Sequence, residues 1–174
     1  KAKSSTAYDT GLYYLNVGLS LVSEETWETN YQLMLQLNQT YAEYQYIMGD
    51  LEASEQHFTK LLQYVKMDFE RIHIYYLMLR IFATSGKYQE ALDLGRKALG
   101  LMGVDYPQMI GEVENEVEMK RANQLQGKRT IAQLFDLPLM SSPHYILMIK
   151  IYSILTPSAY FVDSNLFCFF SLRA

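Results

Sequence analysis

Residues 36–62 read QLNQTYAEYQYIMGDLEASEQHFTKLL, and this stretch decides the fold of the chain. On both sides of Gly49-Asp50 the large apolar residues recur at the period of an α-helix that buries one face. The glycine interrupts the pattern where a tight turn between two helices requires it. The stretch therefore predicts two helices joined by a short turn.

The same period continues along almost all of the 174 residues. Gly and Pro fall between the apolar runs, as at Ser85-Gly86 and Ser142-Pro143, and Asp68 is a good N-cap for a helix that begins at Phe69. No alternating β pattern occurs, so we expect an all-α chain. The predicted helices cover 5–22, 25–48, 51–66, 69–85, 88–101, 108–125, 128–136, 143–156 and 159–171.

Three stretches of the sequence align without gaps and indicate an internal repeat. They are YDTGLYYLNVGLSLVS from Tyr8, LEASEQHFTKLLQYVK from Leu51 and YQEALDLGRKALGLMG from Tyr88. In each, a small residue follows three positions after the first residue: Gly11, Ser54 and Ala91. Small residues at this place let paired helices approach closely.

This pattern resembles the tetratricopeptide repeat. One repeat matches at Ala42, Gly49, Leu51, Ser54, Phe58 and Leu61-Leu62, and the next at Gly86, Tyr88, Ala91 and Ala98-Leu99. The chain departs from the family at Leu79, where a small residue is usual, at Gly95, which replaces an aromatic, and in spacings longer than 34 residues. The resemblance implies a right-handed superhelix of helical hairpins over 5–103, with further hairpins over 104–174.

A second resemblance spans nearly the whole chain. The order KAKSSTAYDTGLYYLNVGL, SEETWETNYQLMLQL, YIMGDLEASEQHF, GKYQEALDLGRKALGLMGVDYP and GKRTIAQLFDLPLM is similar to the helical-repeat region of large signalling kinases. In that family a Ser/Thr-kinase-like domain and an AAA-type signal-transduction ATPase precede the region, and a GAF sensor and a histidine kinase often follow. The resemblance implies a non-catalytic interaction and coupling module, with other proteins or neighbouring domains of the same chain as partners.

Composition narrows the function classes. The net charge is −4, so no basic excess favours nucleic acid or an anionic membrane. Cys168 is the only cysteine, which excludes an intrachain disulfide and fits a reducing compartment, so we predict a cytoplasmic protein. No uninterrupted apolar run approaches the length of a membrane span.

The residue patterns predict no catalytic, cofactor or metal site. Gly127-Lys128-Arg129-Thr130 lacks the first glycine of a phosphate-binding loop and favours a loop entering a helix around Ile131. The three histidines have no metal-ligand spacing; His57 is expected to face solvent, and His144 to be structural in the first turn of a helix. Alternate glutamates from Glu112 to Glu118 indicate a solvated helix face, with Glu116 paired to Lys120 and a buried stripe of Ile110, Val113 and Val117.

One functional surface follows from the repeat resemblance, because the first helix of each pair lines the concave face of a tetratricopeptide array. The positions carried over mix amide, carboxylate, guanidinium and phenol groups, which suit a peptide or a neighbouring domain. They are Gln36, Gln39, Glu43 and Tyr46 in one repeat and His73, Tyr76 and Arg80 in the next.

The last residues of the sequence are apolar, and their side chains need other residues to pack against. LFCFFSLRA has no following element, so we expect the chain to be a piece of a longer protein, or its last helix to fold back or form a homo-oligomer. Two other functions stay open: a stand-alone tetratricopeptide adaptor that binds a peptide in trans, and the effector-sensing domain of a helical-repeat transcription activator.

Overall fold

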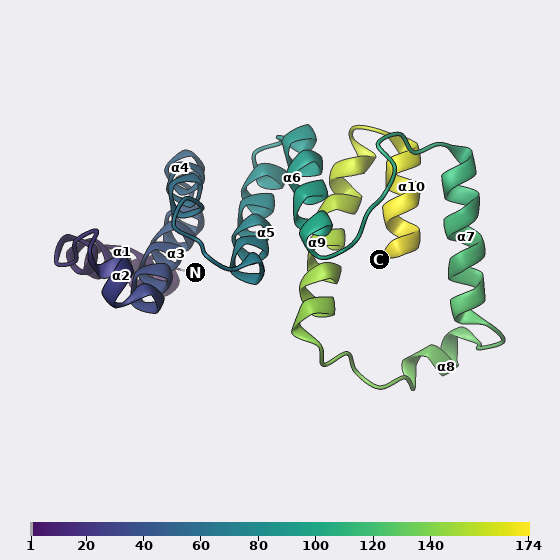
Figure 1. Cartoon of the computed structure of the whole chain (residues 1–174), viewed down its shortest axis with the longest axis horizontal. Coiled ribbons are helices and arrows are strands. Elements are labelled where there is room, and N and C mark those ends of the chain that lie inside the picture. The colour runs from purple at the N-terminus through teal and green to yellow at the C-terminus, as the bar shows by residue number, and fades with distance from the viewer. Residues whose placement is uncertain (1) are drawn as a thin grey trace. The chain divides into compact units, whose positions relative to one another are not determined.

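The computed structural model describes the backbone of residues 2–174 and the side chains of residues 7–130 and 132–174. This part of the chain is all-helical, with ten helices and no strand, which confirms the predicted class (Figure 1). The helices form two compact units, Lys1–Ser85 (unit 1) and Gly86–Ala174 (unit 2), and each unit has its own core.

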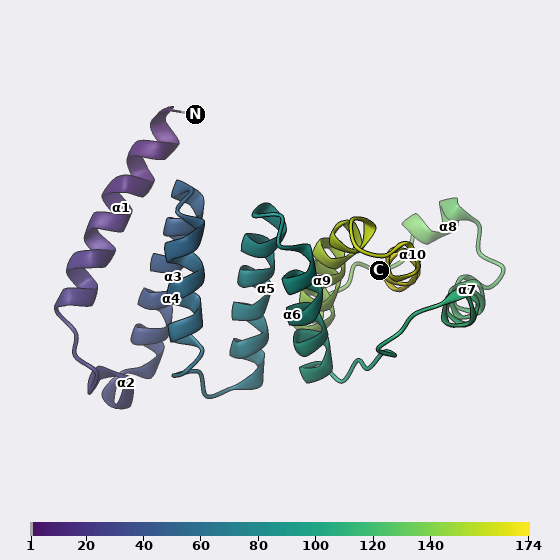
Figure 2. The ribbon, with the colours of Figure 1, turned by 90° about the horizontal axis from the view of Figure 1, so that it is seen from above.

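Unit 1 contains α1 (Ala2–Ser20), α2 (Thr26–Thr29), α3 (Tyr31–Met48), α4 (Leu51–Leu61) and α5 (Asp68–Thr84). α1 packs along α3 (Figure 2). Gly11 lies directly against the ring of Tyr44, and an added Cβ would collide with that ring. The small residue of the first aligned stretch therefore serves the close approach of two helices, as its position predicts.

The hairpin of α3 and α4 is built on small residues. Gly49 ends α3 in the left-handed region at φ 91°, which glycine adopts without steric cost, and the Asp50 side chain then accepts a hydrogen bond from Ala53 N at 3.1 Å. Ala42 and Ser54 are fully buried, and Ser54 Oγ donates to the carbonyl oxygen of Ala42 at 2.7 Å. The fold-deciding stretch thus forms the predicted pair of helices.

Several predicted helix ends in unit 1 are wrong. The predicted helix 25–48 is split at Asn30, whose side chain caps α3 by accepting from Leu33 N. The predicted helix 51–66 ends at Leu61. Asp68 is the first residue of α5 and not its N-cap; Met67 holds that position in an extended conformation, without a side-chain bond.

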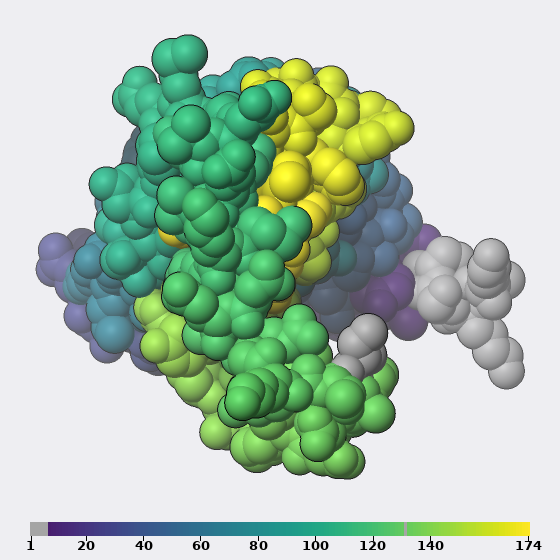
Figure 3. Space-filling model, turned by 90° about the vertical axis from the view of Figure 1, so that its right-hand side faces the viewer, coloured from purple at the N-terminus to yellow at the C-terminus, as the bar shows by residue number. Residues whose placement is uncertain are grey.

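Unit 2 contains α6 (Tyr88–Leu101), α7 (Glu112–Gln126), α8 (Ile131–Phe135), α9 (Pro143–Tyr160) and α10 (Ser164–Arg173). α9 packs on both α6 and α10, and α10 packs on α7. Figure 3 shows α7 running across one face of this unit beside α10, which is yellow. Gly95 of α6 lies against Leu155 of α9, so the glycine that replaces the expected aromatic admits a neighbouring helix.

The C-terminal helices differ from the expectation. α9 continues through Pro157 to Tyr160, where the sequence predicts a break, and Asp163 then caps α10 through Asn165 N and Leu166 N. α10 folds back on α9, and its Phe169 and Phe170 are 2% and 0% exposed. The expectation that LFCFF lies uncovered is therefore wrong for these two rings, because α10 folds back on α9.

Candidate functional site

The predicted concave-face residues lie on α3 and α5 of unit 1, in two rows at helical spacing. In the row on α3, Gln39 Nε2 donates to Glu43 Oε1 at 3.1 Å. Further along, the guanidinium of Arg80 on α5 lies 4.9 Å from the ring centre of Tyr46 on α3, within the range of a cation–π contact. The hydroxyls of Tyr46 and Thr84 share a hydrogen bond at 3.2 Å. The structure thus joins the two rows at the end near Tyr46.

The remaining predicted residues lie on the same two helices, further from this junction. His73 and Tyr76 lie one turn apart on α5, half-buried, with ring centres 6.2 Å apart. Gln36 is exposed on α3, one turn before Gln39. All seven residues therefore belong to the same two helices. The structure brings Gln39 to Glu43 and Tyr46 to Arg80, while Gln36 stays at the exposed start of the row.

The hollow between the two rows is small. Glu43, Tyr46 and Arg80 line it above the apolar side chains of Phe58 and Leu77. Its volume is about 20 Å³, which is room for about one water molecule. At this point the α3–α5 face is therefore a polar surface without a hollow large enough to enclose a small molecule.

Sequence reasoning missed the other end of this face. The Tyr31 hydroxyl donates to Glu70 Oε2 at 2.6 Å, and Gln32 Nε2 donates to Glu70 Oε1 at 3.4 Å. Burial and the Glu70 carboxylate raise the pKa of Tyr31, so its phenol stays protonated as a donor. The signal was present in the spacing, because Gln32 lies four residues before Gln36 and Glu70 three before His73.

The prediction that His57 faces solvent is wrong, because its side chain is half-buried. Its Nε2 lies 2.9 Å from Asn38 Oδ1, and its ring packs 4.9 Å from that of Tyr41. Burial, with a smaller effect from Lys60, lowers the pKa of His57, so the imidazole is more often neutral than an exposed one. His57 also borders a hollow of about 440 Å³ beside Trp27 and Tyr64, whose rings stack 4.5 Å apart.

The glutamate-rich helix α7 corrects two further predictions. Val113 and Val117 are 71% and 57% exposed, so they form no buried stripe, although Ile110 before the helix is buried. Glu118 is 7% exposed, and Arg173 Nη2 donates to its Oε1 at 2.6 Å. The face of α7 that meets α10 is polar, so hydrophobic periodicity predicts the wrong face of α7 as the buried one. The predicted Glu116–Lys120 pair is confirmed at 3.8 Å.

The remaining sequence motifs lie at the starts of helices. Thr130 caps α8 through Gln133 N at 3.3 Å and donates its own N–H to Gln133 Oε1 at 2.9 Å, so residues 127–130 form the predicted loop entering a helix. His144 lies in the first turn of α9, as predicted. Within the described residues no three His, Cys, Asp or Glu side chains gather where they could hold a metal ion. Among these residues there is also no helix with the length and apolar character needed to cross a bilayer.

Comparisons of this chain with protein-family models, with curated proteins and with solved structures found no match.

Proposed function

We propose that this chain is a non-catalytic helical-repeat interaction module that binds an extended protein segment along the α3–α5 face. The observation that carries the proposal is the pairing of the two polar rows, where Arg80 of α5 stacks on Tyr46 of α3 beside Glu43. Helices that are one repeat apart meet at this point in a tetratricopeptide-like array. The superhelical arrangement of the repeats is part of the proposal.

The packing of the α3–α4 hairpin supports the repeat architecture. In the tetratricopeptide pattern, small residues let the two helices of a repeat cross closely. Ala42 and Ser54 occupy those positions here, fully buried and joined by the hydrogen bond from Ser54 Oγ. A hairpin held in this way leaves most of the polar row of α3 half-buried on the side that meets α5.

The chemistry of the face supports recognition rather than catalysis. Glu43 offers a carboxylate, Gln36 and Gln39 offer amides, and Arg80 offers a guanidinium, so backbone and side-chain groups of a peptide would all find partners. A hollow with room for about one water cannot enclose a reacting substrate. We propose that the chain itself has no ATPase or phosphotransfer activity, because the resemblance to large signalling kinases assigns these activities to neighbouring domains.

The wider setting rests on the sequence resemblance. We propose that the module couples a signal-transduction ATPase and kinase domains in the cytoplasm, because the order of motifs from KAKSST to LFDLPLM is similar to that region of large signalling kinases. A stand-alone adaptor is the second candidate. The burial of Phe169 and Phe170 removes the objection that this apolar segment would lie uncovered in an adaptor.

Selection from a displayed library of random peptides, followed by affinity measurements, tests the binding function. We expect selected peptides to lose about tenfold in affinity for Glu43→Gln and for Arg80→Gln, since interface arginines and charged pairs carry large shares of binding energy. Glu52→Gln on the exposed start of α4 is the control and should bind like the unchanged chain. Peptides that bind all three variants equally would show that the α3–α5 face is not the site.

The size of the native polypeptide separates the two candidate settings. A blot under denaturing conditions, with an antibody against residues 24–50, should show a band many times larger than 20.2 kDa if the module belongs to a multidomain kinase. A single band near 20.2 kDa would instead support the adaptor.

A further inference from the structure

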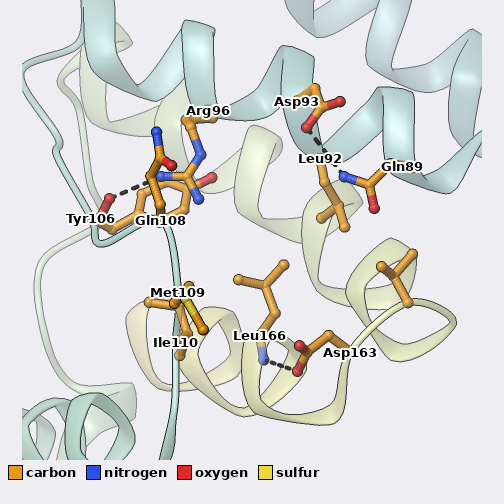
Figure 4. A pocket seen from close by; sticks show the side chains of 11 residues that line it. Gln89, Leu92, Asp93, Arg96, Tyr106, Gln108, Met109, Ile110, Asp163 and Leu166 are labelled. Carbon is orange, nitrogen blue, oxygen red and sulfur yellow. Dashed lines mark hydrogen bonds between the residues drawn. The ribbon is translucent and has the colours of Figure 1, made fainter.

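Unit 2 contains a half-enclosed hollow of about 470 Å³ that no sequence motif predicts (Figure 4). α6 forms one wall, the segment 106–110 before α7 forms a second, and the turn from α9 to α10 forms a third. The volume falls within the range of sites that hold small molecules or peptide side chains. The α3–α5 face lies in unit 1, so this hollow is independent of the proposed function.

The floor of the hollow is apolar. Leu92 of α6 and Ile110 are buried, and Leu166 of α10 completes the floor. Met109 and Val162 line the hollow with exposed side chains, which leaves apolar surface open to a ligand. An aliphatic group that enters here would gain about 25 cal/mol for each Å² of apolar surface that it removes from water.

The only cation that lines the hollow within the described residues, Arg96, is already engaged. Its Nη1 donates to the carbonyl oxygens of Tyr106 at 2.9 Å and Pro107 at 3.3 Å, and its Nη2 donates to Pro107 at 3.3 Å. The guanidinium also lies over the ring of Tyr106, 4.1 Å from its centre. Arg96 therefore fastens the loop to α6, and its donors are directed to the chain itself.

Two carboxylates remain at the rim. Asp93 is exposed on α6, and its Oδ1 accepts a hydrogen bond only from the amide of Gln89 within the contacts described, at 3.2 Å. Asp163 is exposed at the opposite wall, where its Oδ1 caps α10. A ligand therefore meets an apolar floor between two negative charges, beside the amides of Gln89 and Gln108.

We propose that this hollow binds a short protein segment in which an aliphatic side chain lies next to a basic one. The aliphatic group would occupy the floor at Leu92, Ile110 and Leu166, and the basic group would lie beside Asp93. Charge complementarity selects this occupant, since the lining carries two carboxylates against one guanidinium, and the donors of that guanidinium are directed to the chain itself.

Methyl NMR titration of the full chain tests this site with two matched probes, acetyl-Leu-Lys-Leu-amide and acetyl-Leu-Glu-Leu-amide. We expect the basic probe to give saturable shifts at the methyl groups of Leu92, Met109 and Ile110, and to bind at least threefold more tightly than the acidic one. Exposed charge pairs have effects of about this size. The Asp93→Lys variant should reverse the order of the two probes.

The control is Asp105→Lys, an equal change of charge at an exposed residue that does not line the hollow. It should leave the order unchanged. The absence of saturable shifts with both probes would overturn the proposal, as would a preference that Asp93→Lys does not alter. Tighter binding of the acidic probe to the unchanged chain would also overturn it and would assign the hollow to anions. The Glu43 and Arg80 variants test the α3–α5 face alone. If they leave peptide binding unchanged, the proposal for the hollow in unit 2 is not affected.

Discussion

Glu118 and Arg173 form an ion pair across 55 residues of sequence, with Arg173 Nη2 donating to Glu118 Oε1 at 2.6 Å. Glu118 is the one side chain of α7 that is buried within the described residues, and Asn115 Nδ2 adds a hydrogen bond to the carbonyl oxygen of Asn165 at 3.1 Å. α7 therefore docks on α10 through polar groups, and its position depends on their pairing.

Replacing Glu118 by Gln should loosen α7. The variant removes the charge that faces Arg173 and leaves a largely buried guanidinium without its charged partner. We expect unit 2 to lose about 2 kcal/mol of stability, the range for hydrogen bonds to charged groups. Hydrogen exchange of the α7 and α10 amides measures the loss, because amides exchange faster when a helix undocks.

The matched control is Glu116→Gln on the same helix. Glu116 pairs with Lys120 at 3.8 Å, and both side chains are well exposed, so this change should cost less than about 0.5 kcal/mol. Equal exchange rates in the Glu118 and Glu116 variants would mean that the buried pair does not hold α7 in place.

The same pair should make the docking of α7 sensitive to acid. Burial by itself would raise the pKa of Glu118, but hydrogen bonds and charge from Arg173 and Arg121 bring it below its ordinary value of about 4.5. A carboxyl group with a lowered folded pKa contributes stability that is complete above the unfolded value. That contribution is lost as the pH falls through the folded pKa.

Urea unfolding from about pH 7 to about pH 3 checks this prediction. The difference in stability between the unchanged chain and Glu118→Gln should be constant above about pH 5 and should shrink below 4.5, as Glu118 becomes protonated. A difference that stays constant down to pH 3 would contradict the lowered pKa.

Hydrophobic periodicity detects helices that bury apolar side chains, but it does not detect side-chain caps or polar contacts between helices. The two helices on either side of Gly49 follow from their apolar spacing and from the turn glycine. The break at Asn30 does not, because there a side-chain cap on Leu33 N interrupts an otherwise continuous helical pattern. α7 shows the second limit. Its buried side carries Glu118, so a search for apolar residues selects the exposed Val113 and Val117 instead.

Of the two candidate sites, the sequence suggests residues of the α3–α5 face and gives no sign of the hollow in unit 2. The tetratricopeptide resemblance points to Glu43, Tyr46 and Arg80, and helical spacing keeps the members of each row on one face of their helix. The hollow of unit 2 joins α6, the segment before α7 and the start of α10, which lie as much as 77 residues apart in the sequence. Its walls are brought together by the packing of α9 on α6 and α10, by that of α10 on α7, and by Arg96, and no local pattern encodes these contacts.

Two glycines of α6 should respond oppositely to replacement by alanine. A Cβ at Gly95 would overlap the side chain of Leu155, which is fully buried, whereas a Cβ at Gly100 meets open space. We expect Gly95→Ala to destabilise unit 2 by about 1–3 kcal/mol through overpacking. Gly100→Ala should stabilise it by about 0.5–1 kcal/mol, since alanine favours the helix.

Urea unfolding followed by circular dichroism gives both values. Each variant is the control for the other, because the same atoms are added to the same helix. Stabilisation by both substitutions would mean that α9 does not approach α6 at Gly95.

The close crossing of α3 and α4 should not tolerate a larger residue at Ala42. Its side chain is fully buried, and Ser54 Oγ lies 2.7 Å from its carbonyl oxygen, so a leucine would force the helices apart and break this hydrogen bond. We expect Ala42→Leu to destabilise unit 1 by about 2–3 kcal/mol. Trp27, the only tryptophan, reports the unfolding of this unit by fluorescence.

The control is Gln36→Leu, which adds a leucine to an exposed position of α3 and should change stability by less than about 0.5 kcal/mol. Equal unfolding midpoints for the two variants would show that the α3–α4 crossing has room for a large side chain. That result would contradict the proposed repeat architecture of this hairpin.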